Sequence, residues 1–208
     1  MKKILIIILL LALIGISQYP NKPTETELKV GAIESFGKTT DGANTQTFSG
    51  DRIYLSTATP ANSGTLTSCW ARVRVTGAST SEIRIVLFAD NGGTPNGGAF
   101  VGQSDEVAIN WTTSALTEFV VSGTVSVTGG TPYWLGGWAD DPGTPSYEYK
   151  RDNNAGVVHF AAEAYPGGGT PTSPFTSGGT ANGPHNVYCE YDTGGGVIEG
   201  FGDVTIFE

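Results

Sequence analysis

Apolar and polar side chains alternate along several short stretches of this chain, and glycine, proline, asparagine or threonine separates the stretches. The clearest case is Leu66–Val75, where every second position from 69 to 75 is small or apolar and the positions between carry tryptophan or arginine. Glu82–Ala89 repeats the pattern, with isoleucine or leucine at 83, 85 and 87. A period of two is typical of strands that bury one face.

The pattern predicts about ten strands. The stretches concerned are 52–56, 66–75, 82–89, 106–109, 116–122, 124–128, 133–139, 147–150, 157–161, 186–191 and 204–207. No amphipathic helical pattern lies between them, which excludes alternating β–α units. We therefore expect an all-β fold, an antiparallel two-sheet β-sandwich with jelly-roll connections. The stretch 165–184, rich in glycine, proline and threonine, is expected to be a long loop of the functional or mobile kind.

The N-terminus has the pattern of a secretory signal. Lys2 and Lys3 precede an apolar run, Ile4–Ile14, and small residues follow at 15 and 17. We expect a signal peptide over 1–17, a polar spacer over 18–29, the sandwich domain over 30–193, and a glycine-rich linker with a C-terminal strand over 194–208. The protein is then secreted, extracellular or on the cell surface. An uncleaved N-terminal anchor is the alternative, although the run is short against the roughly 20 residues that span a bilayer.

Charge narrows the range of partners. The 208 residues fit one domain, and their formal net charge is −9. Such a surface repels phosphates and anionic lipids, so we expect no nucleic-acid partner and, after signal cleavage, no membrane partner. The acidic surface keeps the protein soluble, and it also attracts cations.

The two cysteines, Cys69 and Cys189, each fall on the apolar register of a predicted strand. An exported protein is exposed to oxidising conditions, so a disulfide between an early and a late strand is one expectation. Two buried free thiols are the other. Pairing requires the two Cα atoms to lie within about 7 Å of each other, which the sequence does not decide.

Several segments resemble a widespread group of extracellular and phage-associated β-sandwich domains. They are Ile85–Pro95 (Ile-Val-Leu-Phe-Ala-Asp-Asn-Gly-Gly-Thr-Pro), Ser104–Val107, Gly130–Gly136 (Gly-Thr-Pro-Tyr-Trp-Leu-Gly), Trp138–Asp141 and Gly50–Tyr54. Members of the group are similar to jelly-roll carbohydrate-binding modules. The resemblance covers 36–191 and implies the fold, but the group has no single activity to carry over. One departure is Asn96-Gly97-Gly98, where a single glycine is usual after the proline.

Signatures of enzymes are missing from the sequence, and we expect a protein that is not an enzyme. There is no zinc-protease, serine-hydrolase, P-loop or dinucleotide motif. Only two histidines occur, and His159 lies in an apolar run that favours a packed strand position. A glycosidase needs only two carboxylates. The candidates for that role are Glu106, Glu118, Asp140, Asp141 and Glu148, although acidic residues on an acidic surface are usually solvated.

Aromatic residues are the stronger functional signal. Tryptophan and tyrosine faces stack on the apolar C–H faces of sugar rings. We expect a ligand-binding set in which Asp140 and Asp141 accept hydrogen bonds from hydroxyl groups beside the rings of Trp70, Trp138, Tyr147 and Tyr149. Trp134 is expected in the core. For Trp138, a core position and an exposed one are both open.

No cofactor is required by the sequence, and calcium is the one metal considered. Asp90 and Asn91 in an Asp-Asn-Gly segment, and Asp140 with Asp141, offer the hard oxygen ligands that calcium prefers. Aspartate and asparagine are also ordinary turn residues.

These observations lead to three functional hypotheses. The first is a secreted, non-catalytic recognition or adhesion module with weak carbohydrate binding, whose partner is a glycan or cell-surface polymer. The second is a structural subunit of a surface layer, phage-like fibre or coat, which self-associates through edge strands and its C-terminal strand. The third is a polysaccharide hydrolase.

Overall fold

The computed structural model of the chain describes residues 29–48, 50–77, 80–140, 147–152, 156–165, 169–194 and 196–197. The predicted signal peptide, nearly all of the spacer and the predicted strand 204–207 lie outside these residues. Contacts group Gly31–Gly196 into one compact unit that contains both large sheets. β1 (Lys29–Val30) and β16 (Gly196–Val197) pair with each other in a separate two-stranded sheet. Among the described residues there is no helix with the length and hydropathy needed to cross a bilayer.

The first large sheet is built around one long central strand, β5. Its members are β2 (Ile33–Gly37), β3 (Asn44–Phe48), β5 (Gly64–Val75), β9 (Ala115–Val120), β10 (Ser126–Val127), β12 (Tyr147–Arg151) and β15 (Val187–Asp192). The strand order is β2-β15-β5-β12-β3, and β9 and β10 also pair with β5. β15 and β9 pair with the same stretch of β5, so they lie on its opposite edges.

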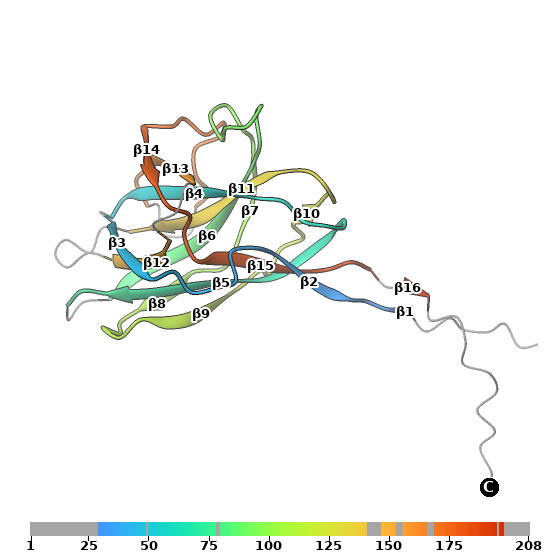
Figure 1. The fold of residues 1–208 in the computed structure, drawn as a ribbon, viewed down its shortest axis with the longest axis horizontal. Helices are drawn as coiled ribbons and strands as arrows, with labels where there is room; N and C mark the ends of the chain where they lie inside the picture. Colours follow the sequence, from blue (N-terminus) through green and yellow to red (C-terminus); the bar gives the residue numbers. More distant parts are fainter. Residues whose placement is uncertain are drawn as a thin grey trace, which may run out of the picture. The chain divides into compact units, whose positions relative to one another are not determined.

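The second large sheet has the order β14-β13-β4-β11-β6-β7, with β8 also paired to β6. Its strands are β4 (Arg52–Ala58), β6 (Ser81–Ala89), β7 (Phe100–Gln103), β8 (Val107–Ile109), β11 (Tyr133–Ala139), β13 (Val157–Ala162) and β14 (Gly179–Asn182). Figure 1 shows β4, β11 and β6 in one layer and β5, β15 and β2 in the other. The predicted antiparallel sandwich is confirmed.

The strand pairing has jelly-roll connectivity. The antiparallel pairs β2–β15, β4–β11, β5–β9 and β6–β7 are nested within one another in sequence, and they fall alternately in the first and second sheets. The chain is therefore one long hairpin rolled into two layers, which is the jelly-roll topology. A fifth nested pair, β3–β12, extends the first sheet.

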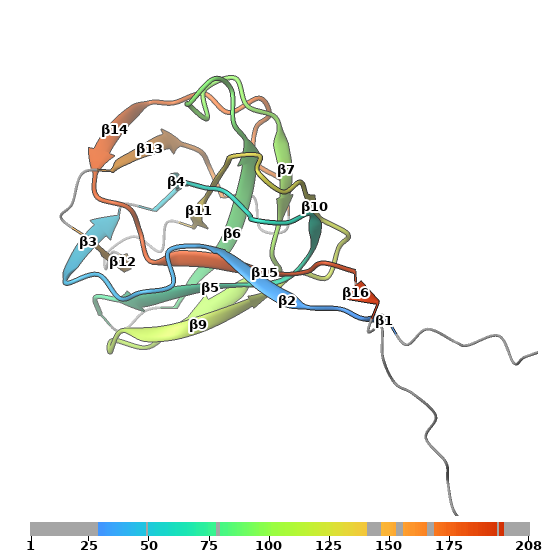
Figure 2. The same cartoon turned by 45° about the vertical axis from the view of Figure 1, so that its right-hand side comes forward.

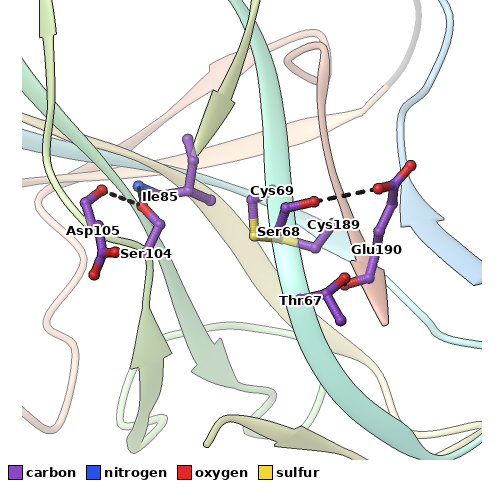
Figure 3. The surroundings of a disulfide bond; sticks show 8 residues. All are labelled: Thr67, Ser68, Cys69, Ile85, Ser104, Asp105, Cys189 and Glu190. Carbon is purple, nitrogen blue, oxygen red and sulfur yellow. Dashed lines mark hydrogen bonds between the residues drawn. A yellow bond between two sulfur atoms is a disulfide. The ribbon is translucent and has the colours of Figure 1, made fainter. Parts of the chain in front are cut away.

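The main core lies between the two sheets. Buried side chains alternate along β5 at 69, 71, 73 and 75 and along β6 at 83, 85 and 87, as their period-two patterns predict. Cys69 and Cys189 are direct partners across β5 and β15, and they form a disulfide inside this core. Figure 3 shows the bond, with Ile85 of the second sheet on the facing side. The disulfide expectation is confirmed, and the expectation of two free thiols is wrong.

A second apolar cluster lies on the outer face of the second sheet. It contains Ile53, Leu55, Val86, Phe88, Trp134, Trp138, Ala161 and Phe175. The chain between β13 and β14 covers it, because Phe175 packs on Phe88 and Tyr165 packs on Trp138. In Figure 2 this orange segment passes beside the green turn that follows β6. Gly97 N donates to Phe175 O at 2.8 Å, and Phe175 N donates to Gly98 O at 2.9 Å.

The expectation of one long irregular loop over 165–184 is wrong at 179–182, although the described residues 169–178 form no strand. Phe175 is buried, and Gly179–Asn182 forms β14, which pairs with β13. The many glycines and prolines favoured the interpretation as a loop, although a few large side chains of the segment pack against the sheet. Its described residues cover the apolar cluster on the outer face of the second sheet.

Candidate functional site

Trp138, expected as a sugar-stacking side chain or as a core residue, is a core residue. It lies in β11, which has β4 on one side and β6 on the other, and its exposed fraction is 0%. Its Nε1 donates to Glu163 O at 3.1 Å, and the Tyr165 ring packs against it with centroids 5.0 Å apart. The expectation that Trp138 binds a ligand directly is wrong, because the covering segment seals the ring from water.

Tyr147 and Tyr149 are buried as well, on the inner face of β12. Burial raises the pKa of both hydroxyls above the usual value. Tyr147 OH donates to Asp140, whose Oδ1 also accepts from Ser81 Oγ at 2.5 Å and from Glu82 N at 2.9 Å. The expected sugar-binding roles of Tyr147 and Tyr149 are wrong, since neither ring reaches solvent. Asp140 fixes a corner of the second sheet, and Asp141 lies outside the described residues.

The expected calcium segment forms a hydrogen-bonded turn. Asp90 Oδ1 accepts from Trp134 Nε1 at 2.7 Å, and Asp90 Oδ2 accepts from Gly93 N at 2.8 Å. Asn91 Nδ2 donates to Asn96 O at 2.9 Å. Both carboxylate oxygens of Asp90 are thus held by protein donors. In the part of the chain that the structure describes, no three His, Cys, Asp or Glu side chains are arranged to hold a metal ion.

Two of the carboxylates considered for hydrolysis are paired with arginines. Glu148 forms an ion pair with Arg74 at 2.5 Å, and Glu106 pairs with Arg84 at 3.2 Å. Glu106 also accepts from Tyr165 OH at 2.7 Å, and this hydrogen bond is the main reason that its pKa is lowered. The structure brings Glu82, which sequence reasoning missed, close to Glu106. The negative charge of Glu106 is the largest of several causes that raise the Glu82 pKa.

Trp70 is the predicted ligand-binding aromatic that remains partly accessible. It stands on the outer face of β5, half-buried, and its register partner across β15 is Tyr188. The two rings stack with centroids 6.3 Å apart and planes 11° from parallel. We refer to Trp70 and Tyr188 as the aromatic pair. Sequence reasoning missed Tyr188, although the inward positions Val187, Cys189 and Tyr191 leave it on the outer face.

The surroundings of the aromatic pair are acidic and partly apolar. Glu118 of β9 is the partner of Trp70 on the side away from Tyr188, and Leu116 and Val120 flank it with 43% and 49% of their surface exposed. Glu190 lies two positions along β15 and accepts from Ser68 Oγ at 3.2 Å. Burial, followed by the charge of Glu190, raises the Tyr188 pKa. The nearby Arg72 is neutralised by Asp41 at 2.7 Å.

Comparisons with known proteins add little. No protein-family model and no curated protein matches the chain. Two solved structures, of infectious bursal disease virus strains Gt and Gx, match at 12% and 10% identity, each with a TM-score of 0.35. Each match covers 78% of this chain and 42% of the virus chain, so this chain spans less than half of their length. Likeness at this level carries no argument about function.

Proposed function

We propose that this protein is a secreted, non-catalytic recognition module that binds a glycan at the aromatic pair. The observation that carries the proposal is the parallel stacking of Trp70 and Tyr188, both half-buried, on the outer face of β5 and β15. Flat aromatic surfaces of this kind match the C–H faces of sugar rings. The resemblance to extracellular sandwich domains, which are themselves similar to carbohydrate-binding modules, favours the same function.

The nitrogen of Trp70 gives further support. Within the described residues, its buried Nε1 has no hydrogen-bond partner. An unpaired buried donor costs about 1–3 kcal/mol, a cost that phenylalanine or leucine at the same position would avoid. Stability alone therefore disfavours tryptophan here, whereas a demand for a large aromatic surface at position 70 favours it.

Charge around the pair defines the class of glycan. Glu118 is the cross-strand neighbour of Trp70, Glu190 lies two positions from Tyr188 in β15, and the chain is acidic overall. Carboxylates accept hydrogen bonds from sugar hydroxyls, and they repel uronic acids and sulfated sugars. The proposed ligand is a neutral polysaccharide.

Affinity electrophoresis with soluble β-glucan, xylan, mannan and polygalacturonate tests the proposal. We expect at least one neutral polymer to retard the parent protein, and Trp70→Ala and Tyr188→Ala each to weaken binding by about tenfold, the upper range for an aromatic contact. Leu116→Ala, an exposed apolar truncation on the same face, is the matched control. The proposal fails if no neutral polymer binds, or if both aromatic variants bind as the parent does. Release of reducing ends during the incubation would instead support a hydrolase.

The edge strand β9 favours a second candidate, a self-assembling structural subunit. Among the described strands β9 pairs with β5, and Leu116 and Val120 project from it into solvent. Open edges with apolar side chains are templates for strand addition. Sedimentation over a wide concentration range separates the candidates, because a recognition module stays at constant mass and a structural subunit polymerises. Val120→Lys should abolish any polymer that uses this edge.

A further inference from the structure

A polar cleft opens at the margin of the sandwich, between the chain after β2 and the end of β4. Its volume is about 470 Å³, and its lining residues are Gly37, Lys38, Thr39, Thr40, Thr57, Ala58, Thr59, Asp152 and Pro184. β13 pairs with β4 only from Arg52 to Ser56, so it stops short of the threonines at the end of β4. We call this feature the threonine cleft.

The chemistry of the threonine cleft matches a neutral polyol. Four threonines line it, and a threonine hydroxyl can both donate and accept hydrogen bonds. Lys38 Nζ lies 2.6 Å from Asp152 Oδ2, and it also donates to Thr40 Oγ1 at 2.9 Å. Because the ion pair cancels both charges, neither a phosphate nor a metal cation finds an uncompensated partner. Pro184 and Ala58 add apolar surface for the C–H groups of a sugar.

One wall of the threonine cleft is held in place by buried hydrogen bonds. Asn186, whose exposed fraction is 1%, donates from Nδ2 to Lys38 O at 3.1 Å and to Thr40 O at 2.5 Å. Lys38 N donates to Val187 O at 2.8 Å, and the ion pair of Asp41 with Arg72 fixes the same connection further along. A wall that is already ordered lowers the entropic cost of binding a ligand.

The threonine cleft adjoins the aromatic pair through Gly37. This glycine lines the cleft and is the register partner of Tyr188, which in turn is the partner of Trp70. Two strand spacings therefore separate Gly37 from Trp70, about 10 Å.

We propose that the threonine cleft binds one neutral sugar unit of the same chain whose following units lie on Tyr188 and Trp70. This inference rests on the proposed function of the aromatic pair. The recognition site then has two different ends, the threonine cleft and the aromatic pair. Full affinity requires an oligosaccharide that reaches both, rather than a single sugar ring.

Amide NMR titrations of the whole protein test this joint site. The probes are glucose, mannose, xylose and glucuronate, followed by di- to hexasaccharides of β-glucan, mannan and xylan. We expect a neutral monosaccharide to shift the amides of 38–40 and 57–59, and a matching oligosaccharide to shift those of 70 and 188 as well and to bind at least tenfold more tightly. Glucuronate should bind more weakly than glucose.

Paired variants distinguish the two parts of the site. Thr57→Val with Thr59→Val removes two hydroxyls at nearly constant shape and should weaken oligosaccharide binding about tenfold. The control, Thr45→Val with Thr47→Val, changes two exposed strand threonines of β3 and should bind as the parent does. If the aromatic amides shift alone and the cleft variant binds normally, the cleft assignment is overturned while the proposed function stands. Shifts confined to the cleft overturn the aromatic-pair assignment and the joint site, and no shift with any probe overturns both.

Discussion

Trp70 and Tyr188 face each other one position away from the disulfide, because Cys69 precedes Trp70 in β5 and Cys189 follows Tyr188 in β15. The disulfide lies inside the core, and the aromatic pair stands on the opposite face of the same two strands. A slip of one residue between strands would move every side chain to the wrong face. The covalent link therefore fixes the register on which the aromatic pair depends.

Removing the disulfide should lower stability substantially. It joins positions 120 residues apart, and the chain-entropy model gives a contribution of about 5 kcal/mol for a closed loop of that size. We expect Cys69→Ala with Cys189→Ala to lose roughly 2–5 kcal/mol in the free energy of unfolding, measured by urea titration. The parent protein under reducing conditions is the comparison. A loss below about 1 kcal/mol would contradict a structural role for the link.

Trp138 and Trp70 should respond to truncation in opposite ways. Trp138→Ala removes a fully buried ring and its hydrogen bond to Glu163, and it should cost about 3–5 kcal/mol in unfolding free energy. Trp70→Ala removes a half-buried ring with an unpaired nitrogen, and we expect less than about 1 kcal/mol. Thermal unfolding followed by circular dichroism measures both. If Trp70→Ala loses more unfolding free energy than Trp138→Ala, the role of Trp70 is to stabilise the fold.

The alternation along β5 and β6 was sufficient to predict the inner faces, because a period of two assigns every other side chain to one side. It also placed Cys69 on the inner face, where the disulfide forms. The pairing of Trp70 with Tyr188 was not predictable in the same way. Their strands lie far apart in the sequence, and the alternation within one strand says nothing about which strand lies beside it.

The error at Trp138 has a clear physical cause, whereas Tyr147 and Tyr149 are buried on the inner face of β12. Alternation identifies two faces of a strand, but it does not reveal whether a further layer covers the outer one. In β6 the outer positions Val86 and Phe88 are apolar too, and this pattern is typical of a strand buried on both faces. These apolar outer positions were the one sign in the sequence that another segment, the glycine- and proline-rich one after β13, packs against the second sheet.

Phe175 should be the main anchor of that covering segment. Its ring packs on Phe88 with centroids 5.2 Å apart, and its backbone exchanges hydrogen bonds with Gly97 and Gly98. We expect Phe175→Ala to cost about 3–5 kcal/mol and to make the segment a site of early cleavage in limited proteolysis. Thr176→Ala, an exposed neighbour, is the matched control. If Phe175→Ala is not cleaved in this segment, and both variants are cleaved elsewhere at the rate of the parent, then other contacts hold the segment.

His185 should make the protein less stable in acid. The side chain is buried beside Tyr54 and Tyr149, and burial, followed by the charge of Arg151, lowers its pKa to about 3. In the unfolded chain it takes up a proton below about pH 6.5, whereas the folded state resists protonation until near pH 3. The unfolded state binds more protons in that window, so the free energy of unfolding falls as the pH decreases from about 6.5 towards 3.

Urea titrations at about pH 7 and about pH 4.5 measure this effect, which should reach roughly 2–3 kcal/mol for one buried histidine. Carboxylates also contribute to the acid loss, but they are common to the parent and its variants. We therefore expect His185→Gln to lose less stability than the parent between the two pH values. His159→Gln is the comparison, because burial also lowers the pKa of this half-buried histidine, and we expect a smaller effect there than at His185. Equal losses in the parent and in His185→Gln would show that His185 does not determine the acid sensitivity.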